Sequence, residues 1–430
     1  MSRRGWLVIA VALLVVLASS WLLLRRGSHA RVSTDISAVT AATLHEPALI
    51  ARGEYLTTVG DCAGCHTAQG GARFAGGRVV PTPFGNISVP NITPDHATGL
   101  GDWSFEDFWR AMHTGHGRRA EWLYPAFPYT SYTKVHRDDA LAIFAYLQSV
   151  SAVRQGNVPP ALEFPYSVRR SLLAWRALYF REGEYKSDPA QSAQWNRGAY
   201  LVQGLGHCNE CHAARGSFGG IASSEHLTGG EIPMQNWYAP DLSTQQNGGL
   251  QGWNQQDIVD LLKTGQSAKG AAFGPMAAVV AGSTQHLSAE DLSAIATYLG
   301  SLPPRAATAG SSRLYVPKAV LAQGEKIYAK QCADCHGKQG EGVGGIYPPL
   351  DGNSTVTEPS GINATRMVLL GGFAPVTAGN PRPYSMPPFA QQLDDSDVSA
   401  VVSYIRQAWS NRVAPVRPER VAGYRHTPID

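Results

Sequence analysis

A chain of 430 residues is long enough for two to four domains. Its 36 basic and 33 acidic side chains leave a formal net charge of +3, which argues against a nucleic-acid-binding protein. The 45 glycines and 28 prolines suit small domains whose loops wrap a cofactor.

An apolar segment with basic neighbours opens the chain. Residues 6–24 are apolar apart from two serines, and a pair of arginines lies on each side. A helix of these nineteen residues would be about 28 Å long, enough to cross the hydrocarbon core of a bilayer. We therefore predict a single transmembrane anchor within residues 1–30, with signal-peptide cleavage near residues 28–30 as the alternative.

The pattern C-x-x-C-H occurs three times and uses all six cysteines. Two thiols at this spacing on a helical turn can each form a thioether with a haem vinyl group, and the adjoining histidine can supply an axial nitrogen. Zinc ribbons and thioredoxin-like pairs also use C-x-x-C, but neither requires the histidine. We therefore predict three covalently bound haem c groups. They are attached at Cys62 and Cys65, Cys208 and Cys211, and Cys332 and Cys335, with His66, His212 and His336 as axial ligands.

A pair of helices is predicted around each motif. A segment with glycine and an aromatic residue precedes it, at residues 53–56, 198–201 and 324–328. An amphipathic segment with acids in its first turn closes each domain, at residues 138–147, 290–299 and 395–405. Such a pair resembles the fold of small class I cytochromes c. The predicted fold is mainly α, with an anchor (1–30), three tandem haem domains (48–150, 195–302 and 319–410), two linkers (151–194 and 303–318) and a tail (411–430).

A proline follows each motif, at Pro90, Pro240 and Pro349. We expect a backbone carbonyl there to accept a hydrogen bond from Nδ1 of the motif histidine and so to fix the imidazole. A simple turn-forming role for the prolines is the alternative.

Methionine is the usual sixth ligand of a c-type haem. Met276 lies 68 residues after Cys208 and Met386 lies 54 residues after Cys332, both in proline-containing loops. We predict that these two methionines ligate the second and third irons, with Met234 and Met367 as the rivals.

The first domain has Phe127 where a methionine is expected, and phenylalanine cannot ligate iron. Met112 aligns with a leucine of the second domain and is expected in the core. We predict either that His116 or His113 is the sixth ligand of haem 1, or that this iron is five-coordinate.

Residues 167–180 of the first linker form a basic and aromatic amphipathic pattern. This pattern predicts a helix that contacts a membrane surface or a partner subunit, or one that packs between haem domains one and two.

The sequence resembles one family from about residue 49 to residue 409, the triple-haem cytochrome c subunits of bacterial membrane-bound dehydrogenases. The resemblance rests on Arg52-Gly53-Glu54-Tyr55-Leu56, Asn91-Ile92-Thr93-Pro94-Asp95, Trp103-Ser104-Phe105-Glu106-Asp107-Phe108, Asn196-Arg197-Gly198-Ala199-Tyr200-Leu201, Gly206-His207-Cys208 and Gly270-Ala271-Ala272-Phe273-Gly274-Pro275-Met276. It implies electron transfer from a separate catalytic subunit of quinoprotein, flavoprotein or molybdenum type to ubiquinone or the respiratory chain. The chain itself would then do no substrate chemistry.

Covalent haem attachment takes place outside the cytoplasmic membrane. We therefore expect an inner-membrane protein whose haem domains face the periplasm. Two other functions are kept open, an electron-feeding subunit of a terminal oxidase and a haem enzyme with an open haem 1 site.

Overall fold

The computed structural model describes residues 41–221, 227–243, 249–303 and 316–425. The chain forms two units, residues 1–43 and 44–430, and α2 (Ala41–Leu44) crosses their boundary. The predicted anchor lies outside the described residues, as does most of the second linker. Within the described ranges, no helix combines the length and the apolar character that a membrane span requires.

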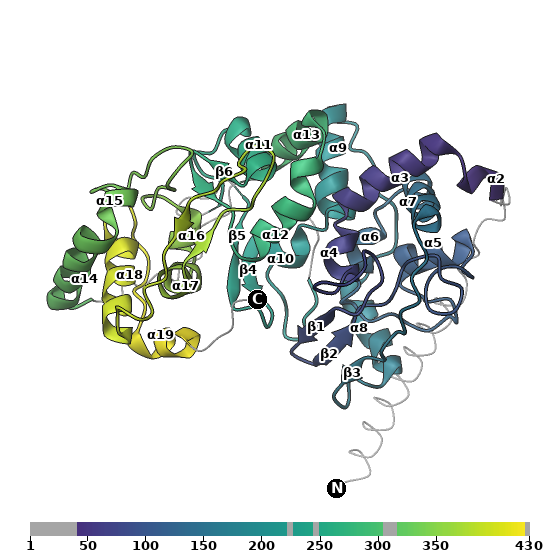
Figure 1. Cartoon of the computed structure of the whole chain (residues 1–430), viewed down its shortest axis with the longest axis horizontal. Coiled ribbons are helices and arrows are strands. Elements are labelled where there is room, and N and C mark those ends of the chain that lie inside the picture. Colours follow the sequence, from purple (N-terminus) through teal and green to yellow (C-terminus); the bar gives the residue numbers. More distant parts are fainter. Residues whose placement is uncertain (1–40, 222–226, 244–248, 304–315, 426–430) are drawn as a thin grey trace, which may run out of the picture. The chain divides into compact units, whose positions relative to one another are not determined.

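Three crossed helix pairs organise the second unit (Figure 1). They are α3 (Pro47–Val59) with α7 (Arg137–Ser149), α9 (Ala193–Tyr200) with α13 (Ala289–Gly300), and α14 (Lys318–Gln331) with α18 (Asp395–Gln407). The prediction of mainly helical domains, each built on such a pair, is confirmed.

A glycine allows each crossing. A Cβ on Gly53, Gly198 or Gly324 would lie 1.9, 2.0 or 2.2 Å from a carbonyl oxygen of the partner helix. Any larger residue would therefore push the two helices apart, so the crossing requires glycine.

The first domain places small elements between its two long helices. They are α4 (Cys62–His66), β1 (Val79–Thr82), β2 (Gly85–Ser88), α5 (Phe105–Thr114) and α6 (Tyr129–Tyr132). β1 and β2 are antiparallel, with Val79 opposite Ser88. The linker strand β3 (Ala161–Leu162) extends this sheet along β2.

The second domain repeats this arrangement with additions. Its elements between α9 and α13 are the π-helical turn η2 (Leu201–Leu205), α10 (Asn209–His212), β4 (Thr228–Ile232), β5 (Trp237–Asp241), α11 (Gln255–Thr264), β6 (Gln266–Ser267), β7 (Gly270–Ala271), α12 (Pro275–Gly282) and the 3₁₀ turn η3 (Thr284–His286). β4 pairs antiparallel with β5, and β6 with β7.

The same capping device starts α5 and α11. Ser104 accepts the N–H of Asp107, whose carboxylate accepts the N–H of Ser104. Asn254 and Asp257 repeat this reciprocal pair in the second domain. A capping box satisfies two backbone donors at a helix start, which explains why both helices begin at these residues.

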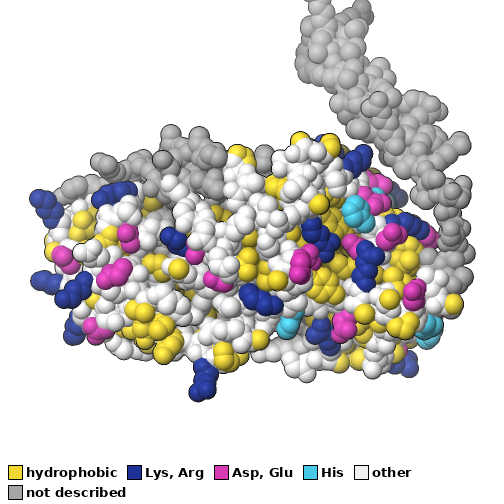
Figure 2. Space-filling view, turned by 90° about the horizontal axis from the view of Figure 1, so that it is seen from above, with side chains coloured by type: hydrophobic (Ala, Val, Ile, Leu, Met, Phe, Trp, Pro, Cys, Tyr) yellow, Lys and Arg dark blue, Asp and Glu magenta, His cyan; other side chains and the backbone are white. Residues whose placement is uncertain are grey.

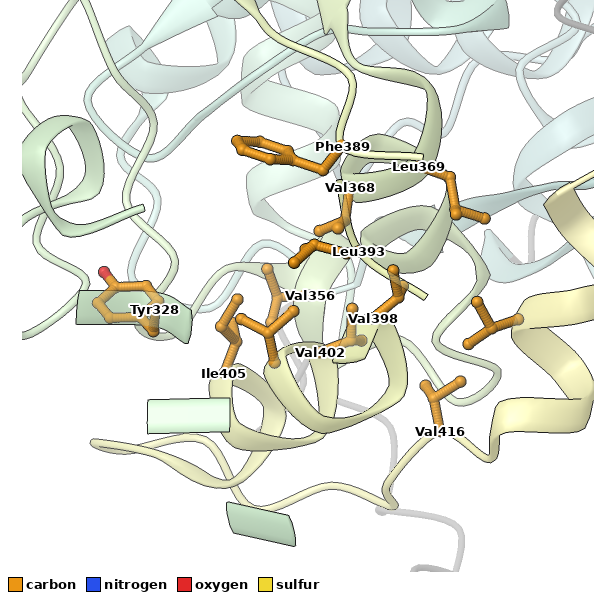
Figure 3. Packing of buried hydrophobic residues seen from close by; sticks show 12 residues of the cluster. Tyr328, Val356, Val368, Leu369, Phe389, Leu393, Val398, Val402, Ile405 and Val416 are labelled. Atoms are coloured by element: carbon orange, nitrogen blue, oxygen red, sulfur yellow. The ribbon is translucent and has the colours of Figure 1, made fainter. Parts of the chain in front are cut away.

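The third domain contains α15 (Ala333–His336), α16 (Ser354–Thr357), α17 (Ile362–Leu370), β8 (Gly372–Phe373) and β9 (Ser385–Met386) between its long helices. Figure 3 shows its apolar core, to which Val398 and Val402 of α18 and Leu369 of α17 contribute. The same core includes Val416 and Val421.

Part of the predicted tail, within the described residues 411–425, packs on the third domain. Val421 lies on α19 (Pro418–Arg425) and is fully buried, and Ser399 of α18 donates a hydrogen bond to the carbonyl of Val416. Two isolated valines are too short an apolar pattern to reveal this packing in the sequence.

The predicted linker helix is α8 (Leu172–Tyr179), which follows the 3₁₀ turn η1 (Arg169–Ser171). Leu172 is buried, whereas Leu173 and Leu178 are exposed. Arg176 lies over the ring of Trp122 in the first domain at 4.0 Å. Trp175 donates a hydrogen bond to the carbonyl of Phe218 in the second domain at 3.0 Å. The helix therefore contacts haem domains one and two, as the second of the two predicted alternatives requires. On the face drawn in Figure 2, basic and acidic side chains are interspersed.

Candidate haem-attachment sites

Each C-x-x-C-H motif folds as a short helix, α4, α10 or α15. Asp61 and His207, the residues before the first two motifs, have positive φ angles of 46° and 39°. This sparsely populated conformation ends the preceding helix and starts the motif helix in a new direction. All six thiols are free. Burial raises the pKa of Cys62 and Cys208 to about 12, so both are neutral thiols.

The motif histidines are held in one tautomer. Nδ1 of His66 lies 2.8 Å from the carbonyl oxygen of Pro90, and Nδ1 of His212 lies 2.7 Å from that of Pro240. Because a carbonyl can only accept, Nδ1 must carry the proton, which leaves the lone pair on Nε2. Burial lowers the pKa of both imidazoles and keeps them neutral, as a metal ligand must be.

The third domain uses a different proline from the predicted one. Nδ1 of His336 lies 2.9 Å from the carbonyl oxygen of Pro348, not Pro349. The loop between motif and proline is shorter here than in the first two domains, so the sequence offered two adjacent prolines without distinguishing their carbonyls.

A glycine packs directly against each of these prolines. These three glycines were not identified from the sequence as part of the sites. Gly76, Gly229 and Gly342 have positive φ angles of 75°, 71° and 64°. A Cβ on any of them would lie between 2.5 and 3.1 Å from the carbonyl carbon of the accepting proline. The glycine between each motif and its proline could have indicated this contact in the sequence. Only glycine permits both the positive φ angle and the close approach to the proline backbone.

The donor set fits a covalently attached haem. Each site offers two reduced cysteines on a helical turn and a neutral histidine with its Nε2 lone pair available. A disulfide or a doubly protonated imidazole would have been incompatible with attachment and ligation.

The two predicted methionine ligands lie in short elements of the second and third domains, Met276 in α12 and Met386 in β9. Met276 lies two residues after Gly274, which has a φ of 53°, and is in the first turn of the apolar helix α12. Met386 lies in β9 opposite Gly372 and packs against the core of the third domain. Both side chains are half-buried. Their ligation of iron stays a prediction.

The rival methionines have different surroundings. Met234 is 52% exposed in the turn between β4 and β5, so it is not a core residue. Met367 lies on α17, and its Sδ would be 3.3 Å from a Cβ on Gly372.

In the first domain both candidate histidines contact aromatic rings. His116 lies 3.7 Å from the ring of Trp122, and its Nδ1 is 2.9 Å from Oγ1 of Thr114. His113 on α5 stacks on Trp109 at 4.4 Å. Phe127, at the place expected for methionine, packs on another aromatic ring.

The two histidines also differ in their electrostatic surroundings. Burial, followed by the charges of Arg176 and Arg110, lowers the pKa of His116 to about 4 and keeps it neutral at pH 7. Nε2 of His113 lies 3.7 Å from a carboxylate oxygen of Glu182. Which of them ligates iron, if either does, stays a prediction.

Comparison with known proteins agrees with this chemistry. A family model described as cytochrome c matches residues 50–151, 196–303 and 321–409. The chain is 36% identical over 411 residues to the cytochrome c subunit of alcohol dehydrogenase (quinone) from Gluconobacter oxydans, covering 90% of this chain and 85% of that protein. It is 37% identical over 395 residues to the gluconate 2-dehydrogenase cytochrome c subunit of Pantoea cypripedii, covering 88% and 90%. It is 34% identical over 447 residues to the fructose dehydrogenase cytochrome subunit of Gluconobacter japonicus, covering 96% and 90%.

Proposed function

This chain belongs to the cytochrome c family, and from that premise we propose that it is the triple-haem electron-transfer subunit of a membrane-bound dehydrogenase. The carrying observation is the threefold site, in which two reduced cysteines accompany a histidine fixed by a proline carbonyl. Cytochrome c subunits of dehydrogenase complexes transfer electrons, so the coarse function follows from the family. The number of haems, the route and the partners are our proposal.

A bound haem supplies an iron that changes between its ferric and ferrous states by one electron. The chain's own residues set how readily that happens. The proline carbonyls strengthen the histidines as ligands by accepting hydrogen bonds from their Nδ1–H groups. Met276 and Met386 would raise the potentials of their irons relative to a histidine ligand. We expect no substrate chemistry on this chain.

The partner would be a dehydrogenase catalytic subunit of quinoprotein, flavoprotein or molybdenum type. The printed names of the relatives include alcohol, gluconate and fructose dehydrogenases, which supports this class of partner. Electrons would pass to ubiquinone or the respiratory chain in the inner membrane. The apolar segment at residues 6–24 would hold the haem domains at the periplasmic face.

Gentle solubilisation of membranes, purification of the full chain and identification of what accompanies it test this proposal. We expect a large dehydrogenase subunit whose substrate reduces the haems in the purified complex. Recovery with copper- and haem-containing oxidase subunits would replace the proposal with the oxidase alternative.

One observation favours a second candidate, a haem enzyme with an open first site. Phe127 stands at the place of a methionine ligand, and both neighbouring histidines are engaged with aromatic rings. Reaction of one haem with peroxide in the isolated chain would support this function.

A further inference from the structure

The first two haem domains contact each other through equivalent residues. Tyr55 on α3 and Tyr200 on α9 each follow their crossing glycine by two positions. The hydroxyl of Tyr55 donates to Asp291 at 2.6 Å and accepts the N–H of Ser288 at 3.2 Å. These partners lie at the start of α13 in the other domain.

Tyr200 makes the reciprocal contacts in the first domain. Its hydroxyl donates to Asp139 at 2.5 Å and accepts the N–H of His136 at 3.3 Å. Asp139 and Asp291 hold the same position in their closing helices, and so do His136 and Ser288. Each domain therefore gives the other the same tyrosine and receives it at the same two positions, as two units related by a local twofold axis would.

An arginine of its own domain fixes each aspartate. Arg52 lies 2.5 Å from Asp139, and Arg197 makes two contacts with Asp291 at 2.7 and 2.8 Å. The two aspartates are 3% and 7% exposed. A buried carboxylate with a cation on one side and a hydroxyl on the other is a specific, directional acceptor. The tyrosine hydroxyls therefore orient one domain on the other.

The contact continues to the turns that lead into the two motifs. A Cβ on Gly60 would lie 3.1 Å from Cδ1 of Leu205, and each of these residues lies two or three positions before a motif cysteine. Ser131 of the first domain lies 3.1 Å from the side-chain oxygen of Asn209, inside the second motif. Ser283 donates to the carbonyl of Val59 just before the first motif. The two attachment turns thus face each other.

The third domain lacks this device. Lys326 stands at the tyrosine position and is exposed, and Gln323 replaces the arginine. Gln323 donates to Asp397, the equivalent aspartate, so that contact stays within one domain. The third domain instead contacts β5 of the second through Asn363, which makes two hydrogen bonds with the backbone of Tyr238. The reciprocal contact is therefore specific to domains one and two.

We propose that Tyr55 and Tyr200 are positioning residues that lock domains one and two into one electron-exchange pair, in which haems 1 and 2 are nearest neighbours across their attachment turns. Cys62, Cys65, Cys208 and Cys211 would hold the two haems, and the covalent bonds would keep each haem beside the turn that carries its cysteines. The pair would supply one-electron exchange between its irons, with no proton or bond transferred. The proposal rests on haem attachment at the first two motifs.

Circular dichroism in the Soret band of the purified full-length holoprotein tests the pairing. Two haem transition dipoles held close and fixed couple, and they give a signal with one positive and one negative lobe. We expect this signal in the wild type and in a Cys332→Ser/Cys335→Ser variant, which cannot attach haem 3. We expect its loss in a Cys62→Ser/Cys65→Ser variant. A wild-type spectrum without the signal, or a signal that depends on haem 3, would overturn the pairing.

Tyrosine variants test the positioning role without removing a haem. We expect Tyr55→Phe and Tyr200→Phe each to weaken the two-lobed signal, and the double variant to weaken it further, with the haem content unchanged. Tyr328→Phe is the matched control. It also removes a tyrosine hydroxyl, but that hydroxyl donates a hydrogen bond to the carbonyl of Gly337 within the third domain. An unchanged signal in the double variant would refute the role of the tyrosines. Failure of a dehydrogenase to co-purify would refute the proposed function and leave this result standing.

Discussion

The residues that decide ligation lie within single loops. Each motif histidine donates a hydrogen bond from Nδ1 to a proline carbonyl, which keeps the proton on Nδ1 and leaves Nε2 free to bind iron. The predicted sixth position differs between the domains, since the sequence places a methionine there in two of them and Phe127 in the first. We therefore expect the differences between the three haem potentials to come mainly from the sixth ligand, on the side of the iron opposite the motif histidine.

Replacing a predicted methionine ligand should shift one haem. We expect Met386→His to lower one of the three midpoint potentials in a redox titration, within the range of about 0.8 V that axial ligands span. Met276→His should lower a different one. Met234→Leu is the control, because that side chain is largely exposed, and it should leave all three potentials in place. Three unshifted potentials in the Met386 variant would exclude Met386 as a ligand.

Haem 1 should stand apart from the other two haems. With Phe127 at the methionine place, we expect it either to bind carbon monoxide when reduced or to titrate at a lower potential with histidine ligation. If His116 is the ligand, His116→Ala should make one haem newly reactive with carbon monoxide, and His113→Ala serves as the comparison. Three inert haems with similar high potentials would contradict both forms of the prediction.

At the scale of elements, one crossed helix pair forms the framework of each domain. The crossing glycines let α3, α9 and α14 approach their closing helices with almost no gap. The paired capping boxes then start α5 and α11 at equivalent places. The domains therefore repeat as whole units and not only at the motif.

A methyl group at a crossing should destabilise its domain. The Cβ of a Gly198→Ala variant would lie 2.0 Å from the carbonyl oxygen of Ala294, so α9 and α13 must separate. We expect a loss of about 1–3 kcal/mol in the free energy of unfolding, the usual cost of overpacking. Denaturant unfolding measures it. Gly300→Ala is the control, since a Cβ there meets open space, and equal stabilities of the two variants would contradict the prediction.

At the scale of the whole molecule, the contact between domains one and two depends on two buried carboxylates, Asp139 and Asp291. Burial raises the pKa of Asp291, but the hydrogen bonds from Arg197 and Tyr55 outweigh that effect, and the net shift is downward. A carboxyl group with a lowered folded-state pKa stabilises the protein above its unfolded pKa of about 3.9, and that stability is lost as the pH falls through the folded value.

Asp291→Asn should therefore weaken the contact between domains one and two in a pH-dependent way. We expect a loss of about 1–3 kcal/mol in the free energy of unfolding at pH 7, because three hydrogen bonds, one from Tyr55 and two from Arg197, lose a charged acceptor. The difference from the wild type should shrink as the pH falls below about 4. Asp397→Asn, at the equivalent place in the third domain, should cost less because its glutamine partner is exposed. A pH-independent difference would show that the charge of Asp291 is not responsible.

The sequence by itself determined the chemistry of each site. The motif cysteines and histidines and the helix pair around each motif were all predictable, because each depends on residues that are neighbours or one helical turn apart. Pro90 and Pro240 were found in the same way, through the repeat between two domains of similar loop length.

Only the tertiary structure decided what contacts what at long range. The choice of Pro348 over Pro349, the burial of Val421 against α18, and the engagement of His116 with Trp122 depend on packing. The contact of Tyr55 with Asp291 joins residues 236 positions apart, which no local pattern encodes. A covalent cofactor imposes a fixed local spacing, whereas the docking of one domain on another is set by shape and by a few buried partners.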